Sequence, residues 1–242
     1  MNKFNIDLDT FCNRNYKVIT RIDPKKTVLL VIDMQRYFLE PGQPAYLPGG
    51  DGAPSGLDVI KPSAKVIEWC RAKDITVIYS KWGLRADGWD VGRWADKWPT
   101  WNAGTPEGPI WPPEGGESSG RFRNYSYATD IVRELEPAEG ELVLTKSRYS
   151  SFDGTVLDTS LRQRPEVDTI IMIGVTTGFC VRYTANDAFA RNYRVAVIAD
   201  CTSAVNDPLF AHAGAGQYIA ALRDISIGLG DVMTSKELFD LL

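Results

Sequence analysis

Residues 169–192, TIIMIGVTTGFCVRYTANDAFARN, decide the fold that we expect for this chain of 242 residues. The stretch opens with an apolar, largely β-branched run that does not alternate with polar residues, which is typical of a strand buried on both faces of a parallel sheet. From about residue 178 to 192 the apolar residues adopt helical spacing. A buried strand that leads directly into a helix is the repeating unit of an α/β fold.

The same alternation recurs on both sides of this stretch. Further strands are expected at 27–33, 75–82, 141–146, 194–200 and 224–229, and further helices at 58–73, 128–137, 155–164, 207–222 and 235–242. Such a series predicts a three-layer α/β/α domain with a mostly parallel sheet of six strands, joined by right-handed crossovers. We expect an N-terminal arm at 1–24 and a single domain at 25–242.

Charge and hydropathy exclude several classes of partner. The formal net charge is −4 and the basic residues are dispersed among acids, so no nucleic-acid-binding surface is indicated. No apolar run reaches signal-peptide length at the start or the ~18 residues that a membrane span needs. We therefore expect a cytoplasmic protein that contacts neither nucleic acid nor membrane.

Cysteine and histidine usage restricts the chemistry. The four cysteines form no CxxC pair and are typical of a reducing compartment. His212 is the one histidine of the chain, which excludes a site built from several histidines. We interpret His212 as a surface or packing residue.

An insertion of unusual composition spans residues 82–124. It contains six of the seven tryptophans and is rich in Gly and Pro, and it is too long for an ordinary connection. We expect either a lid over a pocket or an oligomer interface, since tryptophan is favoured in both. Four arginines in or beside it are candidates for binding a substrate carboxylate, with solvated loop charges as the alternative: Arg85, Arg93, Arg121 and Arg123.

Three polar residues mark the carboxyl ends of expected strands, where open α/β sheets bind ligands. Asp33 follows the strand at 27–33, Lys146 ends the strand at 141–146, and Cys180 lies just beyond the strand that includes Gly174. In the first turn of a helix, Cys180 would have its thiolate favoured by the helix dipole, with Thr176 or Thr177 as the cap. Each residue also has an ordinary structural reading, as a helix cap, a solvated strand end and a small buried hydrophobe. Together they supply a thiol, a base and a balancing cation.

These residues belong to four motifs that resemble the isochorismatase-like cysteine hydrolase superfamily. The motifs are VIDMQRYF with Asp33, KSRYSSF with Lys146, GVTTGFCV with Cys180, and VIADCTSA after the next strand. They occur in the family's order, and the resemblance extends from about residue 25 to 240. It implies a Rossmann-like sheet that carries an Asp-Lys-Cys catalytic triad.

The resemblance also implies a role for each triad residue. Asp33 would accept the proton of Cys180, the thiolate would attack an amide or carbamoyl carbon, and Lys146 would orient and offset the charges. The Val175–Thr176 peptide bond would be cis, and the N–H groups of Thr176 and Cys180 would form an oxyanion hole.

Departures from related branches narrow the expected reaction. Nicotinamidases carry a histidine-containing metal site after the second strand, whereas SKWGLRADGWD here has no histidine, so we predict no metal and no cofactor. Isochorismatases proper lack the cysteine that this chain has at 180. The stretch LVLTKSRYSSF is similar to the ureidoacrylate amidohydrolase branch, and hydrolysis of a terminal carbamoyl or ureido group is the reaction we expect, with another amide such as maleamate as an alternative.

Five residues beside the triad motifs are assigned to the substrate pocket, with core packing as the alternative for each: Gln35, Phe38, Tyr149, Phe152 and Thr177. The resemblance further implies a homo-oligomer, a dimer or a tetramer, that acts on a small amide. Two other functions stay open at this point. One is a catalytically inert protein of the same fold that binds a small ligand, and the other is a redox sensor in which Cys201 pairs with Cys180.

Overall fold

The computed structural model describes residues 16–43, 45–50, 52–85, 89–97, 127–204 and 214–242, and the fold below refers to these residues. Six strands form one sheet in the order β3-β2-β1-β4-β5-β6, and every neighbouring pair is parallel. The strands are β1 Thr27–Ile32, β2 Thr76–Trp82, β3 Leu142–Lys146, β4 Thr169–Val175, β5 Arg194–Ser203 and β6 Asp231–Met233. The expected six-stranded parallel sheet is thus confirmed.

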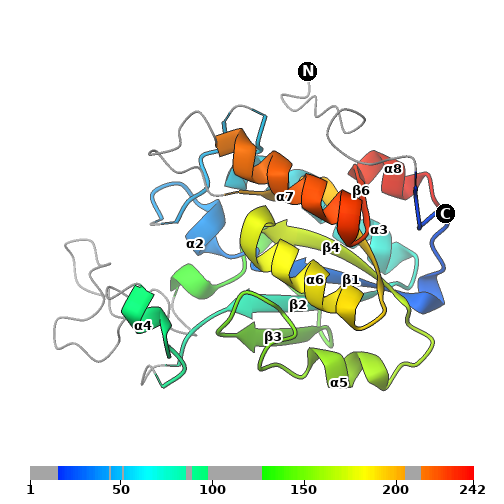
Figure 1. The fold of residues 1–242 in the computed structure, drawn as a ribbon, viewed down its shortest axis with the longest axis horizontal. Coiled ribbons are helices and arrows are strands. Elements are labelled where there is room, and N and C mark those ends of the chain that lie inside the picture. Colours follow the sequence, from blue (N-terminus) through cyan, green and yellow to red (C-terminus); the bar gives the residue numbers. More distant parts are fainter. Residues whose placement is uncertain (1–15, 44, 51, 86–88, 98–126, 205–213) are drawn as a thin grey trace.

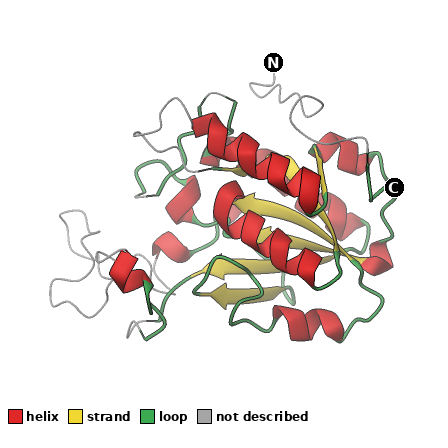
Figure 2. Ribbon diagram, viewed as in Figure 1, coloured by secondary structure: helices red, strands yellow, loops and turns green. Residues whose placement is uncertain are grey.

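Helices cover both faces of the sheet (Figure 1, Figure 2). One face packs against α5 Leu157–Arg162, α6 Arg182–Ala190 and α7 Gly214–Gly228. The opposite face packs against α3 Gly56–Ala72 and α8 Ser235–Phe239. The shorter helical elements are η1 Pro24–Lys26, α2 Arg36–Leu39, α4 Trp94–Lys97, η4 Tyr127–Thr129, η5 Arg133–Leu135 and η6 Thr177–Val181.

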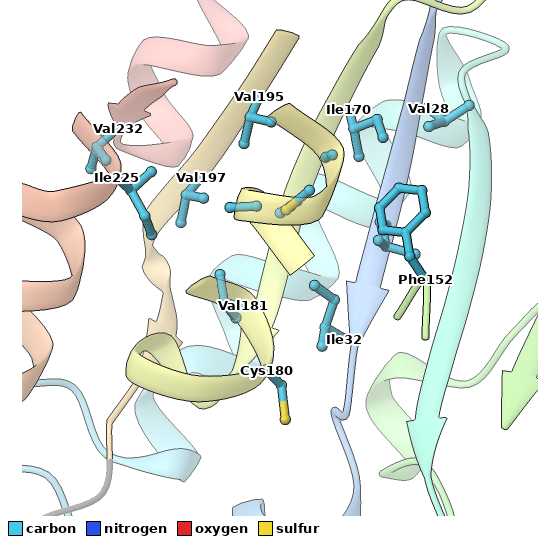
Figure 3. Packing of buried hydrophobic residues seen from close by; sticks show 14 of the residues in the cluster. Val28, Ile32, Phe152, Ile170, Cys180, Val181, Val195, Val197, Ile225 and Val232 are labelled. Atoms are coloured by element: carbon cyan, nitrogen blue, oxygen red, sulfur yellow. The ribbon is translucent and has the colours of Figure 1, made fainter. Parts of the chain in front are cut away.

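The two central strands are buried over their whole length. Every residue of β1 and β4 is buried, as the absence of polar alternation predicts for strands covered on both faces. Each face of the sheet carries an apolar cluster, one beneath α5, α6 and α7 and the other beneath α3 and α8. Side chains of each strand alternate between these two clusters, so that Ile32 packs on the first face and Val31 on the second. Figure 3 shows the first of these clusters, between the sheet and α6.

The strand expected at 224–229 is wrong. Helix α7 continues to Gly228, because Tyr218, Leu222 and Ile225 are fully buried at helical spacing, while Ile227 is 60% exposed. The alternation of Ile225 and Ile227 suggested a strand, but burial on a single helical face extends the helix instead. The sixth strand is the short β6, three residues after Gly228.

The helix expected at 128–137 is also wrong, since two 3₁₀ turns, η4 and η5, replace it. Between these turns the backbone is tied to the segment after β1: Val132 N–H donates to the Met34 carbonyl at 3.1 Å, and Arg36 N–H donates to the Asp130 carbonyl at 2.9 Å. These non-local hydrogen bonds replace the helical ones.

The described part of the N-terminal arm packs on the domain. Asp231 accepts the N–H groups of Val18 and Ile19 at 3.1 and 2.6 Å, and Ile22 N–H donates to the Leu241 carbonyl at 3.0 Å. Within the described ranges, no helix is long and apolar enough to cross a membrane.

Candidate active site

Asp33 leaves the sheet directly after β1. Its backbone has a φ of 52°, in the left-handed region, and its N–H donates to the Ser80 carbonyl of β2 at 2.8 Å. Its side chain is fully buried. The turn holds a carboxylate at the carboxyl end of the sheet, where the sequence places it.

Lys146 reaches the carboxylate of Asp33 from β3. Strand β2 lies between β3 and β1, so Lys146 and Asp33 follow strands that are not adjacent in the sheet. Two strand spacings amount to about 10 Å, a gap that the long lysine side chain can span. Lys146 Nζ donates to Asp33 Oδ2 at 2.6 Å and to the Arg148 carbonyl at 3.2 Å, and both triad side chains are 0% exposed.

Cys180 is presented by the turn that follows β4. The Val175–Thr176 peptide bond is cis, and residues Thr177–Val181 form one π-helical turn before α6 begins. Cys180 therefore precedes the α-helix and does not lie in its first turn. Figure 3 shows its sulfur at the edge of the apolar cluster, pointing away from the side chains packed on the sheet, near the end of β1.

Close approach of β4 and β1 requires a glycine beneath this turn. Gly174 pairs with Ile32 and has a φ of 130°, and a Cβ at this position would lie 2.0 Å from the Ile32 carbonyl oxygen. Only glycine fits both the conformation and the space. The turn that carries Cys180 is thereby placed next to Asp33, the residue after Ile32.

Burial governs the protonation of the triad. Burial, together with the negative charge of Asp33, raises the pKa of the Cys180 thiol to about 12. Burial also raises the pKa of Asp33, against the opposing effect of Lys146. Burial alone would lower the pKa of Lys146, but the charges of Asp33 and Cys180 outweigh it and raise that pKa.

The raised pKa favours a protonated thiol at rest beside the Asp33–Lys146 pair, and not the thiolate that a helix dipole would favour. The expected threonine caps are absent as well: Thr176 makes no side-chain cap to the turn, and Thr177 Oγ1 pairs with Thr202 Oγ1 at 2.8 Å. Desolvation dominates because the sulfur is surrounded by protein.

Asp33 has one carboxylate oxygen available for the thiol proton. Oδ2 is used by Lys146, whereas Oδ1 is buried and receives no regular hydrogen bond from the described parts of the chain. The Cys180 thiol interacts with this carboxylate. The geometry thus places a thiol next to a carboxylate that a buried ammonium group holds in position, an arrangement that would suit cysteine-based acyl transfer.

The oxyanion hole assigned to the N–H groups of Thr176 and Cys180 stays a prediction. The Thr176 carbonyl accepts the N–H groups of Phe179 and Val181 at 3.1 and 3.2 Å, so those two donors are used within the turn.

Two of the five residues assigned to the pocket, Gln35 and Thr177, use their polar side-chain groups in hydrogen bonds to other residues of the protein. Gln35 Nε2 donates to the carbonyls of Trp82 and Thr129, both at 2.8 Å, and its Oε1 accepts the Trp82 N–H at 2.8 Å. Gln35 braces the end of β2 against the segment at 127–132, and Thr177 is tied to Thr202. Their positions indicate a supporting role for both side chains, and direct contact of Gln35 and Thr177 with a substrate stays a prediction.

The aromatic candidates lie in different places. Tyr149 and Phe152 line a cavity of about 390 Å³. Phe38 is half-buried and packs edge-on against Tyr37, with ring centroids 5.0 Å apart.

The cavity adjoins the triad through Tyr149, although none of the three triad residues lines it. The Tyr149 ring stacks on Phe179, the neighbour of Cys180, with centroids 5.0 Å apart. Burial is the largest cause that raises the pKa of Tyr149 to about 12.

Several residues at the site were not singled out from the sequence. Ser80 and Ser151 share a hydrogen bond of 2.7 Å, and Thr184 Oγ1 accepts the Ser151 N–H at 2.9 Å, which links β2, the segment after Lys146 and α6. Gln217 packs against Gly178, where a Cβ would lie 3.0 Å from its side chain. Ser151 lies within the quoted motif KSRYSSF, whereas no local signal marks Gln217.

Part of the expected insertion lies outside the described residues, including Arg121 and Arg123, and so does His212. Of its described arginines, Arg93 is exposed and pairs with Asp96 at 2.9 Å, and the Arg85 N–H donates to Asp90 Oδ1 at 3.0 Å. Where the structure describes the chain, no group of three or more His, Cys, Asp or Glu residues is placed to hold a metal ion.

Comparisons with known proteins identify the family and the relatives of this chain. The family model for the isochorismatase domain matches residues 27–237. A ureidoacrylate amidohydrolase, RutB, of Methylorubrum extorquens is 32% identical over 198 residues, covering 77% of this chain and 73% of the relative. The crystal structure of a cysteine hydrolase from Pseudomonas syringae pv. phaseolicola superposes with a TM-score of 0.77 at 28% identity, covering 91% of this chain and 94% of that one. An N-carbamoylsarcosine amidase from Thermoplasma acidophilum superposes with a TM-score of 0.60 at 26% identity, covering 87% and 96%.

Proposed function

The chain belongs to the isochorismatase family, and from this membership we propose that it is an amidohydrolase that cleaves a terminal ureido or carbamoyl group of a small molecule. The names of two similar proteins, a ureidoacrylate amidohydrolase and an N-carbamoylsarcosine amidase, support this class of substrate. Both names describe the hydrolysis of a carbon–nitrogen bond in a small amide.

The observation that carries the proposal is the buried arrangement of Asp33, Lys146 and Cys180. A thiol, a carboxylate and an ammonium group have converged from three strand ends, and the ion pair of 2.6 Å is fully excluded from water. A buried ion pair is costly to maintain, so its presence beside a nucleophile favours a catalytic explanation over a purely structural one.

The first half of the reaction follows from the protonation states. Asp33 Oδ1 takes the proton of Cys180 as the sulfur attacks the carbonyl carbon, because a thiol with a pKa of about 12 ionises only when a base accepts its proton. The Sγ–C bond forms and negative charge develops on the carbonyl oxygen. The carbon–nitrogen bond then breaks, and the nitrogen leaves as ammonia or an amine with the proton that Asp33 held.

The second half regenerates the thiol. Water attacks the carbonyl carbon of the thioester with loss of one proton to Asp33, the C–S bond breaks to release the carboxylic or carbamic acid, and Asp33 returns the proton to Cys180. Lys146 keeps the carboxyl group of Asp33 in position throughout, and its charge offsets the negative charge of the site, which lies on the carboxylate at rest and on the sulfur while Asp33 holds the proton.

Ammonia release tests the proposal. The purified protein is assayed, with and without prior EDTA treatment, on ureidoacrylate, biuret, N-carbamoyl amino acids, maleamate and nicotinamide. We expect turnover of at least one ureido or carbamoyl compound that survives EDTA and falls by at least about 10⁴-fold in Cys180→Ala. Cys201→Ala is the matched control, because Cys201 is a buried cysteine that packs on the opposite face of the sheet, and it should retain activity.

Trapping of an intermediate tests the mechanism separately. Rapid acid quenching during turnover should leave an acyl group on Cys180 that mass spectrometry detects, and no adduct should form in Cys180→Ala. Undiminished turnover by Cys180→Ala would overturn the mechanism, and failure to hydrolyse any ureido or carbamoyl compound would overturn the substrate class.

A further inference from the structure

The cavity beside the triad contains two cations with different surroundings, Arg148 and Arg191. Arg191 is neutralised by acids of its own helix and of α5: its side chain lies 3.6 Å from Asp158 and 3.8 Å from Asp187. Its guanidinium also covers the ring of Phe152, at 4.7 Å from the centroid. The guanidinium of Arg191 therefore already interacts with two carboxylates and an aromatic ring of the protein.

Among the residues that the structure describes, Arg148 has no such counter-ion. Its Nη1 donates to the carbonyls of Asp90 and Ser147, both at 2.7 Å, and no carboxylate in the described parts of the chain lies within ion-pair distance of it. A guanidinium has five N–H donors, so the donors on Nη2 and Nε lack an acceptor among the described residues. The two carbonyls fix the plane of the group without cancelling its charge.

Arg148 is also tied to the reaction centre. Its carbonyl oxygen accepts a hydrogen bond from Lys146 Nζ at 3.2 Å, and the next residue, Tyr149, stacks on the ring of Phe179 beside Cys180. The cavity lining continues with Trp94, whose ring meets Tyr149 edge-on at 4.8 Å between centroids. Arg148 and Tyr149 thus line one cavity beside the turn that carries Cys180, and Nη2 of Arg148 lies next to Gly92, where a Cβ would be 2.8 Å from it.

We propose that Arg148 binds a carboxylate carried by the substrate at the end remote from the scissile amide. A carboxylate matches two parallel N–H donors of a guanidinium, and in a half-buried cavity this contact is charge-assisted. A short planar spacer between the two groups suits the aromatic lining. Two acids also line the cavity: Asp187 lies 3.8 Å from Arg191, and Asp153 is exposed and so opposes an anion only weakly. The inference rests on the proposed function and adds to it that the preferred substrates are anionic ureido or carbamoyl acids.

The test compares a charged substrate with its uncharged analogue, which differ only at the remote group. Ammonia release is measured for 3-ureidopropionate and for its methyl ester, with wild type, Arg148→Gln, Arg148→Lys and Arg191→Gln. We expect Arg148→Gln to lower kcat/KM about 10- to 100-fold for the acid and less than about threefold for the ester. The loss of kcat/KM for the acid in Arg148→Lys should lie between those of wild type and Arg148→Gln, because lysine keeps the charge and loses the paired N–H donors of the guanidinium. Arg191→Gln should leave the ratio of kcat/KM for the acid to that for the ester unchanged.

An equal loss for both compounds in Arg148→Gln would overturn the inference, since it would show that Arg148 only clamps the carbonyls of Asp90 and Ser147. A binding measurement separates this outcome from failure of the proposed function. The acid should slow alkylation of Cys180 by iodoacetamide in wild type and not in Arg148→Gln, whether or not it is hydrolysed. Equal protection in both proteins would likewise overturn the role of Arg148, while absence of turnover alone would count against the amidohydrolase activity.

Discussion

At the scale of single residues, the buried thiol of Cys180 differs from the reactive, ionised cysteines that line many active sites. Its pKa is raised to about 12 because the sulfur is desolvated and faces the charge of Asp33. The nucleophile is thus formed on demand by proton transfer and is not stored as a thiolate.

Alkylation kinetics should reveal this state. We expect the rate of Cys180 alkylation by iodoacetamide to keep rising up to pH of about 10, about tenfold per pH unit, where an ordinary thiol with a pKa of about 8.5 would level off. The dependence follows from the sign of the shift, since a raised pKa leaves little thiolate at neutral pH. In Asp33→Asn the negative charge is gone, so the rise should move to lower pH. A plateau below pH of about 8 in the wild type would contradict the picture of a protonated thiol.

The Asp33–Lys146 pair is the second feature at this scale. Lys146→Met should lower the free energy of unfolding by about 3 to 5 kcal/mol at neutral pH, because Asp33 is left as a buried charge with no cation. Urea denaturation measures the loss. The double variant Asp33→Asn with Lys146→Met should recover most of it, and Lys236→Met, which breaks an exposed pair with Asp240, should cost less than about 1 kcal/mol.

The loss in Lys146→Met should also depend on pH. Burial raises the pKa of Asp33 in the folded state above its value of 3.8, so folding takes up a proton and stability falls as pH rises through the folded-state pKa. Removal of Lys146 raises the pKa of Asp33 further. The difference in the free energy of unfolding between wild type and Lys146→Met should therefore shrink as the solution is acidified. A deficit that does not change with pH would indicate lost packing and not an unpaired charge.

At the scale of elements, the contact between β1 and β4 positions the nucleophile relative to its base. Gly174→Ala should cost at least about 3 kcal/mol, because a Cβ would lie 2.0 Å from the Ile32 carbonyl oxygen at a φ of 130°. Gly228→Ala is the control, since a Cβ there meets nothing within 4 Å and the backbone is not in the left-handed region. Chemical denaturation of both variants gives the comparison, and equal stability would show that β1 and β4 can separate without cost.

The elements that were mispredicted share one cause. In 224–229 and 128–137, the local pattern of apolar residues was compatible with more than one structure. Contacts between residues distant in sequence then determined which structure forms. Burial of Tyr218 and Ile225 in the apolar cluster favours the continuation of helix α7, and the hydrogen bond from Val132 N–H to the Met34 carbonyl takes the place of a helical one. Short apolar runs do not distinguish strand from helix by periodicity alone.

At the scale of the whole molecule, the sheet separates two apolar clusters. Cys180 packs in the cluster next to α6, whereas Cys201 is fully buried in the cluster on the other face, next to α3. A redox switch between these two cysteines is therefore not supported, because the sheet lies between them.

Oxidation should confirm this separation. After mild peroxide treatment of the folded protein, peptide mass spectrometry without reduction should show no disulfide between Cys180 and Cys201. Burial raises the pKa of Cys201 well above 9.0, which should leave it unmodified as well. Detection of that disulfide in protein that retains its fold would contradict the placement of the two cysteines.

The homo-oligomer, the cytoplasmic location and the role of the insertion at 82–124 stay predictions.

The sequence by itself determined the α/β class, five of the six strands and the identities of Asp33, Lys146 and Cys180. It could do so because strand burial, strand-to-helix transitions and motif order are written in short contiguous stretches. Only the tertiary structure decided that β2 lies between Asp33 and Lys146, that burial raises the pKa of the Cys180 thiol, and that Arg148 lines a cavity with no carboxylate of the described residues within ion-pair distance. Each of these depends on desolvation or on distances between residues far apart in the chain, and neither quantity exists until the sheet has assembled.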